Sequence, residues 1–296
     1  MRDKAVPRMH RFLEAQALSA ALPPLLVAAE RVAATVAQGV HGRRRTGQGE
    51  TFWQFRRYQP GDPTTRIDWR RSAKSDRIYI RQTEWEAAQS VWLWRDASPS
   101  MDYRAAAARP TKRYTAEVLL LALASLLVRG GEHLSLLGDA TPPSSGRATL
   151  ERLAFVLGRA AADGAGLPAQ LPLPRDARVV MFGDWLSPLD RIRAAIRGFS
   201  SRGVRGHLVQ IIDPAEASLP FSGHVVFDGP EGEGIVRFGE VASVRERYVA
   251  AFAAHQRGLQ AVAQSMGWTL LIHSTDRPLP ATLMALYLIL AGQSGG

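Results

Sequence analysis

The sequence lacks several features that would place it in common classes of protein. No cysteine occurs among its 296 residues, which excludes disulfide scaffolds, thiolate zinc sites, iron–sulfur clusters and a cysteine nucleophile. The seven histidines form no H-E-x-x-H or other paired metal-binding spacing. Gly47-x-Gly49 is not followed by G-K-[ST], and no G-x-S-x-G nucleophile elbow lies between an expected strand and an expected helix. Zinc proteases, P-loop nucleotidases and serine hydrolases are therefore disfavoured.

Long apolar runs are absent as well. A membrane-spanning helix needs about 18–20 apolar residues, and the best candidates, Val118–Val128 and Thr282–Ala291, are too short. The apolar stretch Ala15–Ala29 follows basic residues as in a signal peptide, but Glu14 lies between the basic residues and this stretch, and Pro23-Pro24 break it. We therefore expect a cytoplasmic protein without a transmembrane segment. Two N-terminal helices separated by the prolines remain open to peripheral membrane contact.

Lysine is scarce. Lysine and arginine total 37, but only Lys4, Lys74 and Lys112 are lysines, which leaves 34 arginines. The net charge is +10, and the segment from Arg43 to Arg81 alone carries +7. A basic chain favours nucleic acid, an anionic membrane surface or an acidic protein as partner.

Hydrophobic periodicity predicts an α/β fold. From residue 90 onward, strand-like and helix-like patterns alternate, which favours βαβ units and a mostly parallel sheet. The expected strands are Ser90–Arg95, His133–Leu137, Arg178–Phe182, Gly206–Ile212 and Trp268–His273. We expect N-terminal helices over 1–40, a basic β subdomain over 41–88, and the α/β domain over 89–296 with a hairpin inserted near 224–238.

The sharpest local motif is Asp96-Ala97-Ser98-Pro99-Ser100, directly after the first expected strand. Ligands bind at the carboxyl ends of strands in open parallel sheets. One carboxylate and two hydroxyls there are hard oxygen donors, suited to one Mg²⁺ or Mn²⁺ ion. The alternative is that Asp96 and Ser100 only form a turn and cap the next helix.

Asp184 follows another expected strand, so it lies at the same edge as Asp96 if the two strands are parallel neighbours. Its alternative role is a turn or helix-cap aspartate. A third oxygen donor is expected from the loop before the helix at 148–162. The candidates there are Ser144, Ser145 and Thr149.

Several motifs together resemble the bacterial "domain of unknown function 58" family over roughly residues 40–290. The upstream ones are Gly47-x-Gly49-Glu50-x-Phe52, Arg57-Tyr58, Pro60-Gly61-Asp62, Arg66-Ile67-Asp68-Trp69, Ser72-Ala73 and Asp96-x-Ser98-x-Ser100-Met101. The downstream ones are Asp213-Pro214-x-Glu216, Pro220-Phe221, Gly223 and Tyr248.

The resemblance implies a Rossmann-like, von Willebrand factor type A-like fold with a metal-ion-dependent adhesion site. It also implies a non-enzymatic adaptor that works with a MoxR-type AAA+ ATPase in assembling or maturing a client complex. By position, Asp96, Ser98 and Ser100 match the metal motif and Asp184 matches the later aspartate. The threonine ligand has no clear match, Thr149 being the nearest, and Trp185 stands where adhesion domains usually have glycine.

The sequence is also compatible with two other functions. The segment 43–81 could bind nucleic acid, with arginines on phosphates and aromatics on bases, or dock an acidic protein. The competing interpretation is that Trp53 and Trp69 pack in a small core, while Trp92 and Trp94 pack beneath the N-terminal helices. A metal-dependent phosphoesterase is the third hypothesis, and Ser98 and Ser100 have no nearby base for serine hydrolysis.

Overall fold

The computed structural model describes residues 24–40, 51–59, 67–75, 77–84, 90–159, 164, 166–229, 231–232 and 234–292. The chain divides into two compact units, one formed by 1–42 with 89–296 and the other by 43–88. The first of the two expected N-terminal helices falls outside the described residues, whereas the second is α2 (Pro24–Val40).

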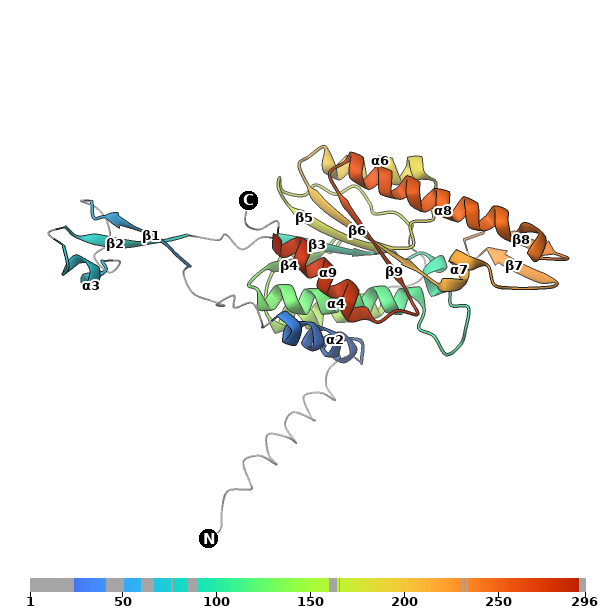
Figure 1. The fold of residues 1–296 in the computed structure, drawn as a ribbon, viewed down its shortest axis with the longest axis horizontal. Helices are drawn as coiled ribbons and strands as arrows, with labels where there is room; N and C mark the ends of the chain where they lie inside the picture. Colours follow the sequence, from blue (N-terminus) through green and yellow to red (C-terminus); the bar gives the residue numbers. More distant parts are fainter. Residues whose placement is uncertain are drawn as a thin grey trace, which may run out of the picture. The chain divides into compact units, whose positions relative to one another are not determined.

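The larger unit is built on a five-stranded sheet (Figure 1). Its strands, in spatial order, are β4 (His133–Leu136), β3 (Ser90–Arg95), β5 (Arg178–Gly183), β6 (Arg205–Ile212) and β9 (Thr269–Ser274). Every neighbouring pair in this sheet is parallel. By chain order the arrangement is second, first, third, fourth, fifth, which is a doubly wound order. The predicted Rossmann-like α/β fold with a mostly parallel sheet is confirmed.

Helices cover both faces of this sheet (Figure 1). One face contributes to a core that includes side chains of α2, α4 (Lys112–Arg129), α5 (Arg147–Arg159) and α9 (Leu279–Gly292). The other face packs against α6 (Leu189–Ser200) and α8 (Ala242–Ser265). These two helical layers cover both faces of the sheet, so a ligand that contacts the sheet would approach it at an edge or at the ends of its strands.

The apolar run of α4 is explained by double burial. Every residue from Thr115 to Leu127 is buried, because α4 lies between the sheet and α2, which contacts it along its length. The buried positions Leu26, Ala29, Ala33 and Val36 of α2 recur at helical spacing. A helix that is apolar all round is a core helix when another helix covers its outer side. No helix in the described part of the chain is long and apolar enough to cross a membrane.

The alternation of β3 sends its tryptophans to the face opposite to the expected one. Val91 and Leu93 point toward α2 and α4, whereas Trp92 and Trp94 pack in the core beneath α6 and α8. The expectation that Trp92 and Trp94 pack beneath the N-terminal helices is therefore wrong. Period-two alternation tells which residues share a face but not which helices cover that face.

In the smaller unit, β1 (Thr51–Arg57) pairs antiparallel with β2 (Tyr79–Glu84), and the short helix α3 (Trp69–Ser72) precedes β2. Asp68 caps α3 by accepting from the Arg71 N–H. Trp69 is 66% exposed, so the expectation that it is a core residue is wrong. The side chain of Trp53 lies outside the described residues.

Short elements fill the end of the sheet where its strands terminate. They are the 3₁₀ helix η2 (Pro99–Asp102), the helix α7 (Pro214–Ser218), and the hairpin of β7 (Val225–Gly229) with β8 (Gly234–Phe238). The hairpin was expected from its turn composition, whereas η2 and α7 are too short to show helical periodicity.

Two buried histidines predict how stability depends on pH. His207 and His273 each bond a threonine through Nδ1 at 2.8 Å, and burial lowers the pKa of both side chains to about 4. Between pH 6.5 and 4 the unfolded chain binds protons that the folded chain resists. The free energy of unfolding should therefore fall as the pH drops through this window, by up to about 3 kcal/mol per histidine.

Urea unfolding at pH 7.5 and 4.5 measures this dependence, and the double variant H207N/H273N should lose most of it. Comparing the change with pH, rather than absolute stability, cancels any cost of the substitutions themselves. An equal change in the variant and the natural sequence would contradict this assignment.

Candidate metal centre

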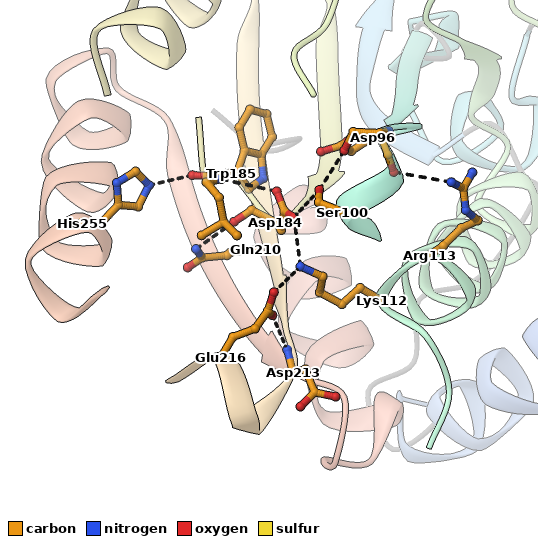
Figure 2. A network of polar contacts seen from close by, with 12 residues as sticks. Asp96, Ser100, Lys112, Arg113, Asp184, Trp185, Gln210, Asp213, Glu216 and His255 are labelled. Carbon is orange, nitrogen blue, oxygen red and sulfur yellow. Dashed lines mark hydrogen bonds and ion pairs between the residues drawn. The ribbon is translucent and has the colours of Figure 1, made fainter. Parts of the chain in front are cut away.

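The two aspartates predicted as ligands lie where the order of the sheet reverses. From β3 the chain continues to β4 on one side and later to β5 on the other, which makes the carboxyl ends of β3 and β5 the topological switch point of the sheet. The Asp96 N–H donates to the Phe182 carbonyl at 2.8 Å, which joins the two strand ends. Asp96 follows β3 and Asp184 follows β5, so both carboxylates lie at this switch point (Figure 2).

The D-x-S-x-S loop combines a turn with a chain of hydroxyls. Asp96 Oδ1 accepts from the Ser98 N–H at 2.8 Å, which is the turn role considered above. Ser100 Oγ donates to Asp184 Oδ2 at 2.7 Å, and the hydroxyls of Ser98 and Ser100 are 2.9 Å apart. Because the Ser100 hydroxyl donates its single proton to Asp184, Ser98 must be the donor in the hydrogen bond between the two serines. Both hydroxyl oxygens therefore keep a lone pair for another ligand.

The residue that follows Asp184, Trp185, has a strained backbone conformation. Trp185 has φ of +57°, a conformation that glycine adopts more easily. Three contacts hold Trp185. Its indole donates to the Val209 carbonyl at 3.2 Å and lies 5.6 Å from the Trp94 ring, and its carbonyl meets His255 Nε2 at 2.7 Å. The tryptophan thus supports the same turn by packing and hydrogen bonds.

Two charged residues that sequence reasoning missed complete the cluster (Figure 2). Lys112, at the start of α4, is fully buried and donates to Asp184 Oδ2 at 2.9 Å and to Glu216 Oε1 at 2.5 Å. Burial alone would lower the pKa of Lys112, but the adjacent carboxylates of Asp184 and Glu216 outweigh it and raise that pKa. The lysine is therefore an ammonium ion.

The motif Asp213-Pro214-x-Glu216 builds the arm that holds this lysine. Asp213 caps α7 by accepting from the Ala215 N–H, and Glu216 Oε2 accepts from the Asp213 N–H at 2.8 Å. This capping box fixes Glu216 while its other oxygen faces Lys112. Asp213 Oδ2 also accepts from the Ala105 N–H, which ties α7 to the segment after η2.

Charge at the cluster does not balance. The carboxylates of Asp96, Asp184 and Glu216 carry three negative charges, and Lys112 supplies one positive charge. The buried carboxylate of Asp213 is not counted, because it accepts from the backbone N–H groups of Ala105 and Ala215 and does not contact Lys112 or the two serines. The nearby arginines are paired elsewhere, Arg95 with Glu117 and Arg113 with Asp102. Two formal negative charges are left in a largely buried site, which is costly without a further cation.

Asp96 shows where that cation would be needed. Its Oδ2 is buried and accepts no hydrogen bond from the described residues. Burial, reinforced by the charge of Asp184, raises the pKa of Asp96 to about 6. An unpartnered buried carboxylate oxygen, beside two serine oxygens and a second carboxylate, fits a hard divalent cation such as Mg²⁺ or Mn²⁺.

The described residues contain no cluster of three or more histidine, cysteine, aspartate or glutamate side chains that could hold a metal ion. The proposed site has only two such side chains, Asp96 and Asp184, and its other two donors are serine hydroxyls. Any ion there must therefore take its remaining ligands from water or from another molecule.

The expected third donor lies in a different network. Thr149 Oγ1 is 2.9 Å from Ser144 Oγ and donates to the Ser145 carbonyl, and no contact of the described residues joins it to Asp96 or Asp184. The segment that approaches the aspartates is instead the one before β5. A Cβ placed on Gly166 would lie 3.7 Å from Asp96 Oδ2, Ser98 Oγ and Ser187 Oγ.

The structure therefore brings together Asp96, Ser98, Ser100 and Asp184, and it does not bring Thr149 into their network. Lys112 gave no signal in the sequence beyond being one of three lysines. Glu216 lay inside a family motif that carried no assigned chemistry, and Ser187 lay three residues after Asp184.

Fold and cluster together define a doubly wound α/β protein with an oxygen-rich site at the switch point of its sheet. The family model described as "Protein of unknown function DUF58" matches residues 54–258, so the chain belongs to this family. Two relatives are the uncharacterized proteins Rv1480 of Mycobacterium tuberculosis (strain H37Rv) and Mb1516 of Mycobacterium bovis. Each is 27% identical over 275 residues, which cover 88% of this chain and 86% of the relative.

Solved structures with some similarity include an aerotolerance-related membrane protein from Bacteroides fragilis and the conserved hypothetical protein BatB from Bacteroides thetaiotaomicron. The first is 15% identical and the second 13% identical, each with a TM-score of 0.41. The matches cover 69% and 71% of this chain, respectively, and the whole of each solved chain.

The unbalanced charge predicts the effect of neutralising Asp96. With the pKa of Asp96 raised to about 6, its ionised form destabilises the folded chain above that pH. In EDTA at pH 8, Asp96→Asn should therefore raise the free energy of unfolding by about 1–3 kcal/mol. Thermal melts measure the change.

Asp190→Asn is the matched control, because Asp190 is an exposed aspartate paired with Arg193 on the surface of α6. Its removal should change stability by less than about 1 kcal/mol. A clear loss of stability in Asp96→Asn under chelation would show that the ionised carboxylate is already well satisfied.

Proposed function

We propose that this protein is a non-enzymatic, metal-dependent adaptor that acts in the cytoplasm with a MoxR-type AAA+ ATPase on a client complex. The observation that carries the proposal is the buried, unpartnered Oδ2 of Asp96 in a cluster with two excess negative charges. Asp96, Ser98, Ser100 and Asp184 would hold one Mg²⁺ or Mn²⁺ ion. Thr149 is left out because its hydroxyl is engaged with Ser144 and Ser145.

The role of the bound ion would be recognition. A divalent cation at this switch point would supply positive charge and coordination positions that a carboxylate of a partner protein can fill. Other groups of the chain orient the two carboxylates that would bind the ion. The Ser98 N–H orients Asp96, and Ser100 together with Lys112 orients Asp184.

Catalysis is not proposed, because the hydroxyls of Ser98 and Ser100 contact each other and Asp184, and no described contact joins either serine side chain to a histidine. The choice of ATPase partner follows from family membership, since the residues themselves supply only an oxygen-rich recognition site.

Metal binding is the direct test of the site. Equilibrium dialysis with Mn²⁺ should show one ion per chain for the natural sequence and a loss of at least about tenfold in affinity for Asp96→Ala, since a charged ligand is removed. Thr149→Ala should bind as the natural sequence does. Equal Mn²⁺ binding by Asp96→Ala and the natural sequence would remove the site.

The partner is tested by capture from native lysate in Mg²⁺, with Asp96→Ala and an EDTA wash as comparisons. Recovery of a AAA+ ATPase only by the metal-loaded natural sequence supports the adaptor function. Recovery of the same ATPase in all three samples would place the contact elsewhere on the chain.

A second candidate function, nucleic-acid binding, is favoured by one observation in the smaller unit. Trp69 is 66% exposed beside Arg70 and Arg71, both also exposed. Asp68 and Ser72 hold this helix in place, because the Ser72 hydroxyl donates to the Asp68 carbonyl and accepts from the Tyr79 N–H. An exposed indole among guanidinium groups suits a base stacked between phosphates.

Fluorescence anisotropy with a labelled single-stranded oligonucleotide tests this alternative. Binding should weaken steeply with salt, and Trp69→Ala should cost about tenfold in affinity because one stacked base is lost. Tyr114→Ala removes an exposed aromatic side chain from the larger unit and should have no effect. No binding at low salt, or equal binding by Trp69→Ala, would exclude the alternative.

A further inference from the structure

Lys112 is one of very few lysines in a chain whose basic residues are almost all arginines. Only three of its 37 basic residues are lysines. Lys4 lies outside the described residues, Lys74 is exposed, and Lys112 is fully buried. An ammonium is a compact point charge, whereas a guanidinium is a wide planar fork. A chain that uses arginine almost everywhere has the smaller cation at the point where the carboxylates of Asp184 and Glu216 converge.

The ammonium sits at the centre of this arrangement (Figure 2). It bonds Asp184 on one side and Glu216 on the other, at 2.9 and 2.5 Å, with the Tyr103 ring 5.9 Å away. Asp184 Oδ2 is the same oxygen that accepts from Ser100. The carboxylate of Asp184 thus links Lys112 to Ser100 of the D-x-S-x-S loop, and the capping box of α7 keeps Glu216 in place on the other side of the lysine.

A purely structural ion pair would have a different charge balance. One lysine and one carboxylate neutralise each other, and burying such a pair leaves no net charge. Here one ammonium serves two carboxylates, while Asp96, across Ser98 and Ser100, receives no charge compensation from it by direct contact. Lys112 therefore reduces the negative charge of the cluster from three to two without removing it.

We infer that Lys112 is a resident cation that sets the valence of the ion the site accepts, so that one divalent ion, and not a trivalent one, neutralises the cluster. This inference rests on the proposed metal site and adds a specificity-determining residue to it. Coulomb interaction scales with the charge of the ion. Changing the fixed charge of the site therefore alters the affinity for a trivalent ion more than that for a divalent ion.

Three variants change that charge stepwise. Lys112→Gln leaves the cluster at minus three, Glu216→Gln leaves it at minus one, and the double variant K112Q/E216Q returns it to minus two. Glutamine keeps hydrogen-bonding groups in each position. Glu151→Gln makes the same chemical change in an exposed pair with Arg147 on α5 and serves as the control.

The measured quantity is the ratio of Tb³⁺ to Mn²⁺ affinity, from Tb³⁺ luminescence and its displacement by Mn²⁺. Trp94 can sensitise Tb³⁺, because a Cβ on Gly183 would lie 3.2 Å from Asp96 Oδ2 and 3.5 Å from the Trp94 ring. Lys112→Gln should raise the ratio by about tenfold or more, and Glu216→Gln should lower it by a similar factor. The double variant and Glu151→Gln should match the natural sequence.

The outcomes distinguish failure of the proposed metal site from failure of the role inferred for Lys112. If the natural sequence binds neither ion, the metal site itself is wrong. If it binds both and the ratio stays the same in all variants, the site stands and the role of Lys112 is overturned. Should Lys112→Gln fail to fold, the opposite shift expected for Glu216→Gln and the restored ratio of the double variant still test the inference.

Discussion

The structure depends on one electrostatic constraint: three carboxylates and a single ammonium share a buried site at the end of the sheet. Asp96 and Asp184 arrive there because they end neighbouring parallel strands, and Glu216 arrives on α7. Lys112 balances one charge of the three. Burying the remaining negative charge is unfavourable. This cost is the physical reason for proposing a bound cation at the site.

The surrounding elements can be understood as the means of holding this site rigid. Lys112 begins α4, which is buried along its length between the sheet and α2. Glu216 is fixed by the α7 capping box, and Asp213 in that box also binds the segment after η2. Trp185 retains a left-handed backbone because its ring and carbonyl are both anchored. Groups fixed in this way would bind the proposed ion without the cost of reorganising.

The sequence was sufficient to predict the strands of the sheet and two of the four charged residues of the site, Asp96 and Asp184. Alternation along Ser90–Arg95 and the apolar run at Arg178–Gly183 located the strands, and parallel pairing then placed Asp96 and Asp184 at one edge. Lys112 and Glu216 were not predictable, because a helix start and a five-residue capped turn approach the site only through tertiary packing. Thr149 failed for the same reason, since the segment with Gly166, and not its own loop, approaches Asp96. The face occupied by Trp92 and Trp94, and the exposure of Trp69, depended on packing partners that local patterns do not encode.

Crystals soaked in Mn²⁺ and measured for anomalous scattering would test the central claim most directly. The account predicts a single strong peak in contact with carboxylate oxygens of Asp96 and Asp184, with Lys112 still beside Glu216. No peak at saturating Mn²⁺, or a peak away from both aspartates, would contradict the claim that the buried charge at the switch point is a cation site.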